Sequence, residues 1–584
     1  MEITHLIRKK VAQAVQQLYD HSVNTDSLLL SPTRKEFDGD YTLVVFPFTK
    51  LAKKGPADIA KEIGDFLTSQ VAEIIDYNII KGFLNLTVSN DHWPILLNEL
   101  HKQQEIGKHP STGKKVIVEY SSPNTNKPLH LGHMRNILLG WASSQILEKA
   151  GNEVIKTQII NDRGIHICKS MIAWQKYGNG ESPESAKMKG DHLVGKYYVI
   201  FNNKDKEQSE GLEKDQESAI MLEARALLKK WEANDPETIE LWKTMNAWVY
   251  SGFNETYKEL GVSFDVVYYE SETYLLGKDI ISKGLDKGVF YKKDDGSVWI
   301  DLEDAKLDHK LVLRSDGTSV YMTQDIGTAK KRFEDYKMDG MTYVVGDEQN
   351  YHFKALFEIL KKLKEPFAEN LHHLSYGMVN LPEGKMKSRE GTVVDADDLI
   401  AVVIKEVAEE SKERGELDAT EEEKQAIWEK IGLGALKYHL LKVNPRKSMV
   451  FDPKESVDLL GQTGPYIQYA YVRIQGILRK LKDDVDPSFA LNYKHIQPHE
   501  KQILLLIQQY PNIIQKAADN FDPSEIAHFA YNLASAFHKF LHDIKVLTAE
   551  NQEAKAFRLM LSRTTGSVLK SSFQLLGIEM PEKM

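Results

Sequence analysis

Cysteine is nearly absent from this sequence, whose 584 residues include one, Cys168. One cysteine cannot form an internal disulfide or supply a cysteine-based metal site. No run of residues approaches the roughly 18 uninterrupted apolar positions of a membrane-spanning helix. Fixed-period repeats and low-complexity tracts are also missing. We therefore expect a protein of a reducing compartment, the cytoplasm, with no membrane partner.

An excess of basic residues is lacking too. Lys and Arg number 75 against 85 Asp and Glu, which gives a formal net charge of −10. Such a chain has no bulk attraction to nucleic acid, so a polyanionic partner must bind at local basic patches. Glycine (36) and proline (19) are sparse, and 42% of the residues are hydrophobic. This composition predicts a globular protein with large cores rather than a disordered one.

The order of apolar and turn patterns divides the chain into three parts. Residues 1–113 mix helical and strand patterns and predict a small α+β unit. Residues 114–396 predict a parallel α/β sheet, interrupted by a polar, helical insertion at about residues 182–265. Residues 397–584 show amphipathic helical patterns and predict a helical domain. The strand candidates of the middle part are residues 114–120, 154–160, 298–302, 319–323 and 341–345.

The densest polar motif, SSPNTNKPLHLGH at residues 121–133, lies between a predicted strand and a predicted helix. A helix N-terminus presents unpaired N–H groups and a positive dipole end, so a loop that feeds it can bind nucleotide phosphates. His130 and His133 would share one face of the first turn, and Gly132 would leave room for a base or ribose. For an isolated motif, the commoner role is to cap the helix.

A second motif, GKMKSREG at residues 384–391, is a polar loop flanked by glycines. Lysines in such a loop can stabilise the charge that develops on a leaving pyrophosphate. Taken alone, the segment is equally consistent with a solvated charged turn.

Together the two motifs resemble those of class I aminoacyl-tRNA synthetases, with HLGH as the HIGH-type motif and KMKSR as the KMSKS-type loop. Residues 121–136, 315–326 and 461–473 are similar to arginyl-tRNA synthetases in particular. The resemblance covers nearly the whole chain. It implies a Rossmann-like α/β catalytic domain between an N-terminal α+β domain that contacts tRNA and an all-α anticodon-binding domain.

The activity that the resemblance implies is arginine–tRNA ligase. ATP would activate L-arginine to arginyl-adenylate, and the arginyl group would pass to the 3′-terminal ribose of tRNA(Arg). Asp325 is expected to pair with the guanidinium, which favours carboxylates, while Tyr321 and Gln349 fix its plane and Glu119 faces the α-amino group or its neighbourhood. Taken singly, Asp325 would more often cap a helix. The arginine-binding residues expected by resemblance are Glu119, Ser121, Asn124, His133, Tyr321, Asp325 and Gln349.

The resemblance also assigns nucleotide-binding and catalytic residues. Mg²⁺ is expected to arrive with the ATP phosphates, since no dedicated metal-ligand spacing is present. The second lysine of the common KMSKS pattern is replaced by Ser388, and Lys127 is expected to take over its work on the phosphates. ATP binding is expected at His130, Gly132, His133, Met378, Val379 and Lys385, and catalysis at Lys127, His130, His133 and Lys387.

The tRNA contacts expected in the C-terminal domain are Tyr466, Tyr469 and Arg473, at helical spacing. Aromatic rings and Arg suit the unstacked bases of an RNA loop. The alternative is that the tyrosines belong to the core of the helix bundle, which is at least as good a reading of Tyr469. The partners expected are tRNA(Arg), L-arginine and ATP, and the protein is expected to be a monomer.

Three other functions stay open at this point. A class I synthetase for another amino acid would share the nucleotide motifs, but the acidic pocket argues against it. A catalytically silent tRNA-binding homologue would not need intact HLGH, Glu119, Asp325 and Gln349. A small-molecule nucleotidyltransferase would leave the long helical C-terminal third unexplained.

Overall fold

The computed structural model describes residues 3–34, 36–213, 216–382, 395–415, 419–481 and 485–584. They form two compact units. The larger unit comprises Gly107–Tyr469, Pro511–Tyr531 and Lys570–Met584, and the smaller unit comprises Met1–Ile106, Ala470–Tyr510 and Asn532–Leu569.

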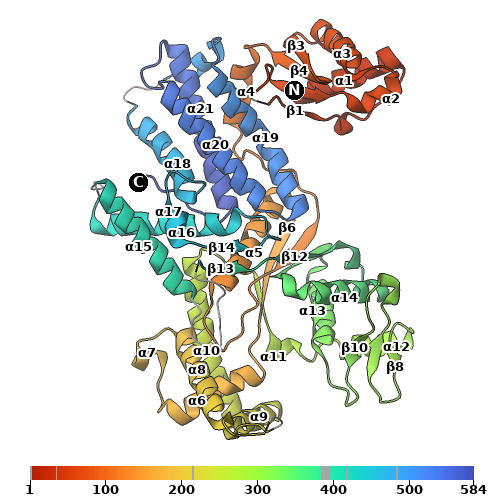
Figure 1. The fold of residues 1–584 in the computed structure, drawn as a ribbon, viewed down its shortest axis with the longest axis vertical. Coiled ribbons are helices and arrows are strands. Elements are labelled where there is room, and N and C mark those ends of the chain that lie inside the picture. Colours follow the sequence, from red (N-terminus) through yellow and green to blue (C-terminus); the bar gives the residue numbers. More distant parts are fainter. Residues whose placement is uncertain (1–2, 35, 214–215, 383–394, 416–418, 482–484) are drawn as a thin grey trace. The chain divides into compact units, whose positions relative to one another are not determined.

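The larger unit contains a five-stranded parallel sheet in the order β12-β11-β5-β6-β7, of which β6 and β12 are labelled in Figure 1. The chain runs outward from β5 through β6 to β7, and it returns on the other side of β5 with β11 and β12. In open parallel sheets, ligands bind beyond the carboxyl ends of the strands where the order reverses. The 121–133 motif directly follows β5, at this point. The strands are β5 (Lys115–Glu119), β6 (Glu153–Ile160), β7 (Val266–Tyr269), β11 (Gly340–Gly346) and β12 (Leu371–Tyr376).

Two of the strand predictions need correction. Residues 298–302 contain β9 (Val298–Ile300), but β9 lies in an antiparallel sheet with β8 (Tyr291–Lys292) and β10 (Lys310–Leu313). The prediction of a strand at residues 319–323 is wrong, because helix α13 (Tyr321–Tyr336) begins there. The hydroxyl of Thr323 accepts a hydrogen bond from the Val320 N–H, which caps the helix in spite of the strand-like composition. The other three candidates are confirmed as β5, β6 and β11.

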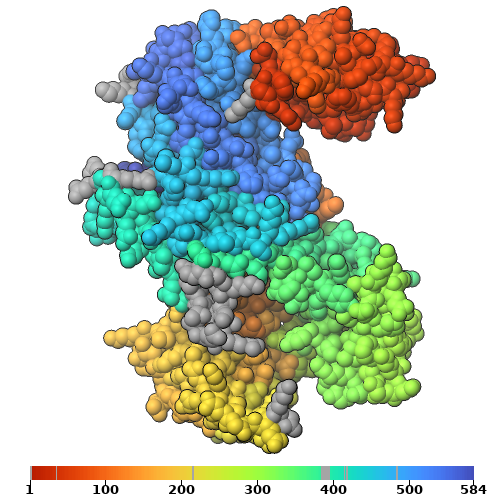
Figure 2. Space-filling view, viewed as in Figure 1, coloured from red at the N-terminus to blue at the C-terminus, as the bar shows by residue number. Residues whose placement is uncertain are grey.

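Helices surround the sheet and form the insertion. Helix α5 (Leu131–Lys149) contacts β5, β6 and β11, and α14 (Asn350–Lys362) contacts β12. The predicted insertion is helical, and in the space-filling view a hollow separates it (yellow) from the green residues that follow (Figure 2). The helices from β6 to β8 are α6 (Ile165–Tyr177), α7 (Pro183–Ala186), α8 (Gly190–Ser209), α9 (Ala219–Glu232), α10 (Pro236–Glu259), α11 (Glu270–Thr273) and α12 (Lys278–Asp286).

The last third of the chain is helical, as its amphipathic pattern predicts. One short exception is β14 (Met449–Val450), which pairs in parallel with β13 (Val379–Asn380). The helices are α15 (Ala396–Arg414), α16 (Glu421–Leu441), α17 (Pro453–Val457), α18 (Gly464–Arg479), α19 (Pro498–Asn520), α20 (Ser524–Asp543) and α21 (Gln552–Leu575).

The smaller unit contains an antiparallel sheet in the order β1-β2-β4-β3, with helix α3 packed on β3 and β4. Its N-terminal elements are α1 (Ile3–Tyr19), β1 (Leu30–Pro32), β2 (Tyr41–Val44), α2 (Thr49–Ala52), α3 (Pro56–Gln70), β3 (Ile74–Ile80), β4 (Phe83–Val88) and α4 (His92–Lys102). Among the described residues, no helix is both long and apolar enough to cross a membrane. The boundaries at residues 113 and 396 stay predictions.

Candidate active site

The two histidines of the 121–133 motif form the first turn of α5. His130 is the N-cap, and its Nδ1 accepts a hydrogen bond from the Gly132 N–H at 3.2 Å. Nδ1 of His133 accepts from the His130 N–H at 3.2 Å, which completes a capping box. The two rings stack, with centroids 3.8 Å apart. A Cβ on Gly132 would lie 3.1 Å from the His130 ring, so this imidazole occupies the space that the glycine leaves.

Both imidazoles are neutral near pH 7. Burial, with help from the Lys127 charge, lowers the pKa of His130 to about 4. Burial, with the neighbouring His130 imidazole and the charge of Lys127, holds the pKa of His133 well below its usual range. Because each Nδ1 accepts a backbone hydrogen bond, each ring carries its proton on Nε2. The capping role and a binding role are therefore compatible, since each ring keeps one N–H donor.

A cavity of about 390 Å³ lies at this turn and brings together most of the expected nucleotide-binding residues. Lys127, His130, Gly132, His133, Met378 and Val379 all line it. We call this space the first cavity. Lys385 and Lys387 lie outside the described residues. Residues of the lining that the sequence did not single out include Asn136, Glu348, Tyr376 and Asn380.

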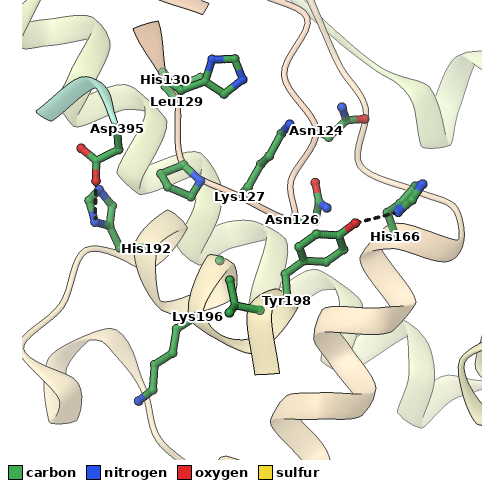
Figure 3. A pocket seen from close by; sticks show the side chains of 13 residues that line it. Asn124, Asn126, Lys127, Leu129, His130, His166, His192, Lys196, Tyr198 and Asp395 are labelled. Atoms are coloured by element: carbon green, nitrogen blue, oxygen red, sulfur yellow. Dashed lines mark hydrogen bonds and ion pairs between the residues drawn. The ribbon is translucent and has the colours of Figure 1, made fainter. Parts of the chain in front are cut away.

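A second cavity of about 360 Å³ shares Lys127 and His130 with the first. Lys127 lies between His130 and Asn124 in the close view (Figure 3). Insertion residues form the opposite side, where His192 pairs with Asp395 and Tyr198 hydrogen-bonds His166 (Figure 3).

Lys127 combines partial burial with an uncompensated charge. Among the described residues, no carboxylate forms an ion pair with its ammonium group. Burial lowers the pKa of Lys127, because the charged form loses hydration. An unpaired cation at the junction of two cavities is suited to an anionic ligand, since phosphate oxygens restore the lost solvation.

The expected arginine-binding residues on α13 and α14 lie at the starts of these helices. Tyr321 begins α13 and is 75% exposed, and Gln349, also exposed, precedes α14. Because the segment from Tyr321 is helical, Asp325 follows it by about one turn. Asp325 Oδ2 lies 2.6 Å from Nε2 of His352, which joins the two helices. His352 is a partner that the sequence did not reveal.

Glu119 and Ser121 already have protein partners. Glu119 forms a buried ion pair with Arg332 of α13. Ser121 adopts φ +57°, and its Oγ lies 2.7 Å from the Tyr257 hydroxyl. These contacts tie the end of β5 to α13 and to the insertion helix α10. Glu119 would therefore contact the substrate while it stays paired with Arg332. The Ser121 hydroxyl would contact the substrate only by giving up its hydrogen bond to Tyr257.

Glu270 is a carboxylate that sequence reasoning missed. It directly follows β7, so it lies at the carboxyl end of a parallel strand. Burial raises the pKa of Glu270 to about 6, against the lowering effect of Arg163 and with a further rise from Asp162 and Asp325. The interaction places Glu270 in the electrostatic environment of Asp325. The strand-end rule applied to residues 266–269 would have found it.

The expected tRNA-binding residues lie on α18 in differing environments. Tyr466 is partly buried, with its ring centroid 5.3 Å from that of Tyr531. Tyr469 is exposed and lines a cavity of about 360 Å³ with, among others, Trp428, Leu459 and Met584. Arg473, which belongs to the smaller unit, contacts His538 through Nη1 and Nδ1 at 2.9 Å.

Two groups of histidine and carboxylate side chains among the described residues lie close enough together to bind a metal ion. One group, Asp301, Glu303 and His309, is largely exposed. In the other, Asp191, His192 and Asp397, the ammonium of Lys189 already lies 2.5 Å from Asp397 Oδ2. A protein cation thus already lies beside both carboxylates of the second group.

The sequence matches three family models: an arginyl tRNA synthetase N-terminal domain at residues 5–88, the class I (R) tRNA synthetase catalytic domain at residues 95–452 and a DALR anticodon-binding domain at residues 467–584. It is 51% identical to the arginine–tRNA ligase of Parabacteroides distasonis and 52% identical to that of Phocaeicola vulgatus, each over 100% of both chains. The fold matches Thermus thermophilus arginyl-tRNA synthetase with a TM-score of 0.79, at 24% identity and over 100% of both chains. The predicted fold class is confirmed, and the chain belongs to the arginyl-tRNA synthetase family of class I aminoacyl-tRNA synthetases.

Proposed function

We infer that this chain is an arginine–tRNA ligase, which activates L-arginine with ATP and esterifies the 3′-terminal ribose of tRNA(Arg). The observation that carries the inference is full-length identity of 51–52% to arginine–tRNA ligases. The first cavity supports it, because it gathers Lys127, His130 and His133 beyond the carboxyl end of β5, where a nucleotide is expected.

In the first step, the arginine carboxylate attacks the α-phosphate of ATP, and the bond to the β-phosphate breaks to release pyrophosphate. Mg²⁺ enters with the ATP phosphates as part of the substrate. Lys127 and the two Nε2–H groups stabilise negative charge as it develops, and Lys385 and Lys387 assist from the second motif. Met378 and Val379 contact the nucleotide together with Gly132. No covalent protein nucleophile is needed, since positioning and charge stabilisation supply the rate.

Arginine is selected by carboxylates at the ends of neighbouring elements. Asp325 accepts hydrogen bonds from the guanidinium, and Tyr321 and Gln349 fix the orientation of the guanidinium plane. Glu119 and Asn124 bind on the side of the α-amino group. We add Glu270 to the guanidinium side, because it directly follows β7 at the carboxyl end of the strand and interacts electrostatically with Asp325. A lysine substrate would lack the planar fork and leave acceptors unpaired.

The second step transfers the arginyl group from the adenylate to a ribose hydroxyl of the tRNA, with release of AMP. Tyr469 and Arg473 are proposed to contact the anticodon loop. Trp428, which lines the same cavity as Tyr469, is available for base stacking. Tyr466 is proposed to stabilise this face of helix α18. The protein acts as a monomer in the cytoplasm, which is compatible with a buried Cys168 whose thiol pKa is raised to about 12 by burial.

ATP–pyrophosphate exchange with a panel of amino acids, with and without bacterial tRNA, tests this function. We expect exchange with arginine alone, and a strong rise when tRNA is added. Exchange with a different amino acid would keep the nucleotide site and overturn the pocket assignment. Exchange with none of them would favour a silent tRNA-binding homologue.

The pH dependence of arginine binding tests the role of Glu270. With a pKa raised to about 6, its carboxyl is ionised at pH 7 and mostly protonated at pH 5. The guanidinium requires the ionised form, so the KM for arginine should rise about tenfold between pH 7 and pH 5, while the KM for ATP changes little. Glu270→Gln should raise the KM at pH 7 and flatten this profile. An unchanged profile in the variant would exclude Glu270 from the pocket.

A further inference from the structure

Arg135 is a fully buried residue of α5 to which no role has been assigned so far. Its side chain is 0% exposed. Nη1 donates to the Gly377 carbonyl at 2.6 Å, and Nη2 donates to the carbonyls of Pro445 and Asn444 at 3.3 and 3.4 Å. Among the described residues, no carboxylate forms an ion pair with this guanidinium. Burial lowers the pKa of Arg135 to about 10.

The three carbonyls belong to two segments that are joined along their backbones. Gly377 N–H donates to the Pro445 carbonyl at 2.9 Å, and Met449 N–H donates to the Met378 carbonyl at 3.0 Å. Strand β13, which follows Gly377, pairs with β14. The approach at Gly377 is so close that a Cβ there would lie 2.6 Å from the Ser448 nitrogen. Arg135 therefore binds the point where the two segments meet.

Helix α5 and the segment that begins at Gly377 both line the first cavity. Helix α5 supplies Gly132, His133 and Asn136, and the segment after Gly377 supplies Met378, Val379 and Asn380. Asn136, the residue next to Arg135, also donates to the Val344 carbonyl at 2.6 Å on β11. The planar Arg135 guanidinium, a rigid fork, therefore connects helix α5 to the segment that begins at Gly377.

The cost of this arrangement argues for a role in the site. A buried charge without a counter-ion is expensive, and an apolar side chain would fill the volume at lower cost. What an apolar side chain lacks is the directional hold on three carbonyls. In its place the Gly377 carbonyl would lose its donor, whereas the carbonyls of Pro445 and Asn444 would keep the N–H groups of Gly377 and Lys447. The uncompensated positive charge also favours an anionic ligand in the neighbouring cavity.

We propose that Arg135 is a positioning residue of the nucleotide site, which sets the separation of α5 from the segment 377–380 and so determines the affinity for ATP. The proposal rests on the proposed function for the identity of the nucleotide. Arg135 acts through the backbone that it holds and does not itself touch the substrate.

Arg135→Lys is the decisive variant, because it keeps the charge but replaces the fork with a single ammonium group. We expect its KM for ATP to rise at least tenfold, with the KM for arginine within twofold of the original protein. ATP binding measured by equilibrium dialysis should weaken by the same factor. Unchanged ATP affinity would overturn the proposal, as would a parallel rise in the KM values for arginine and tRNA, which indicates a general structural role.

Arg446→Lys is the matched control. Arg446 directly follows Asn444 and Pro445, is exposed and makes none of these carbonyl contacts. If Arg135→Lys fails to fold, Gly377→Ala decides, because its Cβ would force the two segments apart. A folded Gly377→Ala variant should show raised KM for ATP, and an unchanged value would refute the proposal. Absence of arginine-dependent exchange in the original protein would instead overturn the proposed function, so the two failures are distinct.

Discussion

Lys127→Ala is expected to lower the rate of arginyl-adenylate formation about 100- to 1,000-fold, the range seen when one preorganised charge-stabilising donor is removed. Lys127 lines both cavities, is partly buried and has no ion-pair partner among the described residues. Its charge is therefore available to a leaving pyrophosphate and strengthened by low solvent exposure. Single-turnover formation of arginyl-adenylate at saturating ATP and arginine measures the effect.

The comparison that matters is Lys387→Ala, for which we expect less than a tenfold decrease in the same rate. Lys204→Ala serves as a control for the loss of one positive charge, since Lys204 is paired with Glu207 on the surface of α8. Similar decreases in kcat for Lys127→Ala and Lys387→Ala would refute the division of labour between the two motifs.

Asp325→Asn is expected to raise the KM for arginine roughly 10- to 150-fold, which corresponds to about 1.5–3 kcal/mol for a hydrogen bond to a charged group. The substitution keeps the shape and one acceptor but removes the charge that the guanidinium requires. Because the Asp325 side chain is 41% exposed, solvent screening favours the lower part of this range. The KM for ATP and the melting temperature should stay close to those of the original protein.

Two further variants separate substrate binding from structure. Asp308→Asn changes an exposed carboxylate that accepts a hydrogen bond from Tyr351, and we expect no effect on arginine. His352→Ala removes the protein partner of Asp325 and should change the KM for arginine less than Asp325→Asn does. If His352→Ala and Asp325→Asn raise the KM for arginine equally, the role of Asp325 is to hold α14 in place, and its assignment to the guanidinium is wrong.

Local sequence patterns predicted the structure correctly where the residues concerned are contiguous in the chain. The β-branched run at residues 114–120 forms β5, and the HLGH residues form the first turn of α5. The strand prediction at residues 319–323 failed, because α13 begins at Tyr321 in spite of the strand propensity of these residues, with the Thr323 hydroxyl accepting from the Val320 N–H. The capping of α5 by His130 and His133 shows that a structural and a binding role can belong to the same two side chains.

Contacts between distant segments were beyond the sequence. No sequence pattern near Glu119 indicates Arg332 as its partner. None near Arg135 indicates Gly377 and Pro445, which follow it by more than 200 residues. Glu270 was missed because residues 266–269 were not recognised as a strand, and its significance depends on the position of β7 in the sheet and on its electrostatic interaction with Asp325. These interactions depend on strand order, which local periodicity does not encode.

The sequence by itself determined the α/β class, the position of the nucleotide motif at a strand end and the helical character of the insertion and of the C-terminal third, because each depends on the spacing of residues within about one element. Only the tertiary structure decided which side chains share a cavity, which carboxylates already have partners and which histidines are neutral. These properties depend on burial and on short distances between residues far apart in the chain. Solvation and Coulomb energies change steeply with both, so the electrostatics of the site became visible only once the sheet order was known.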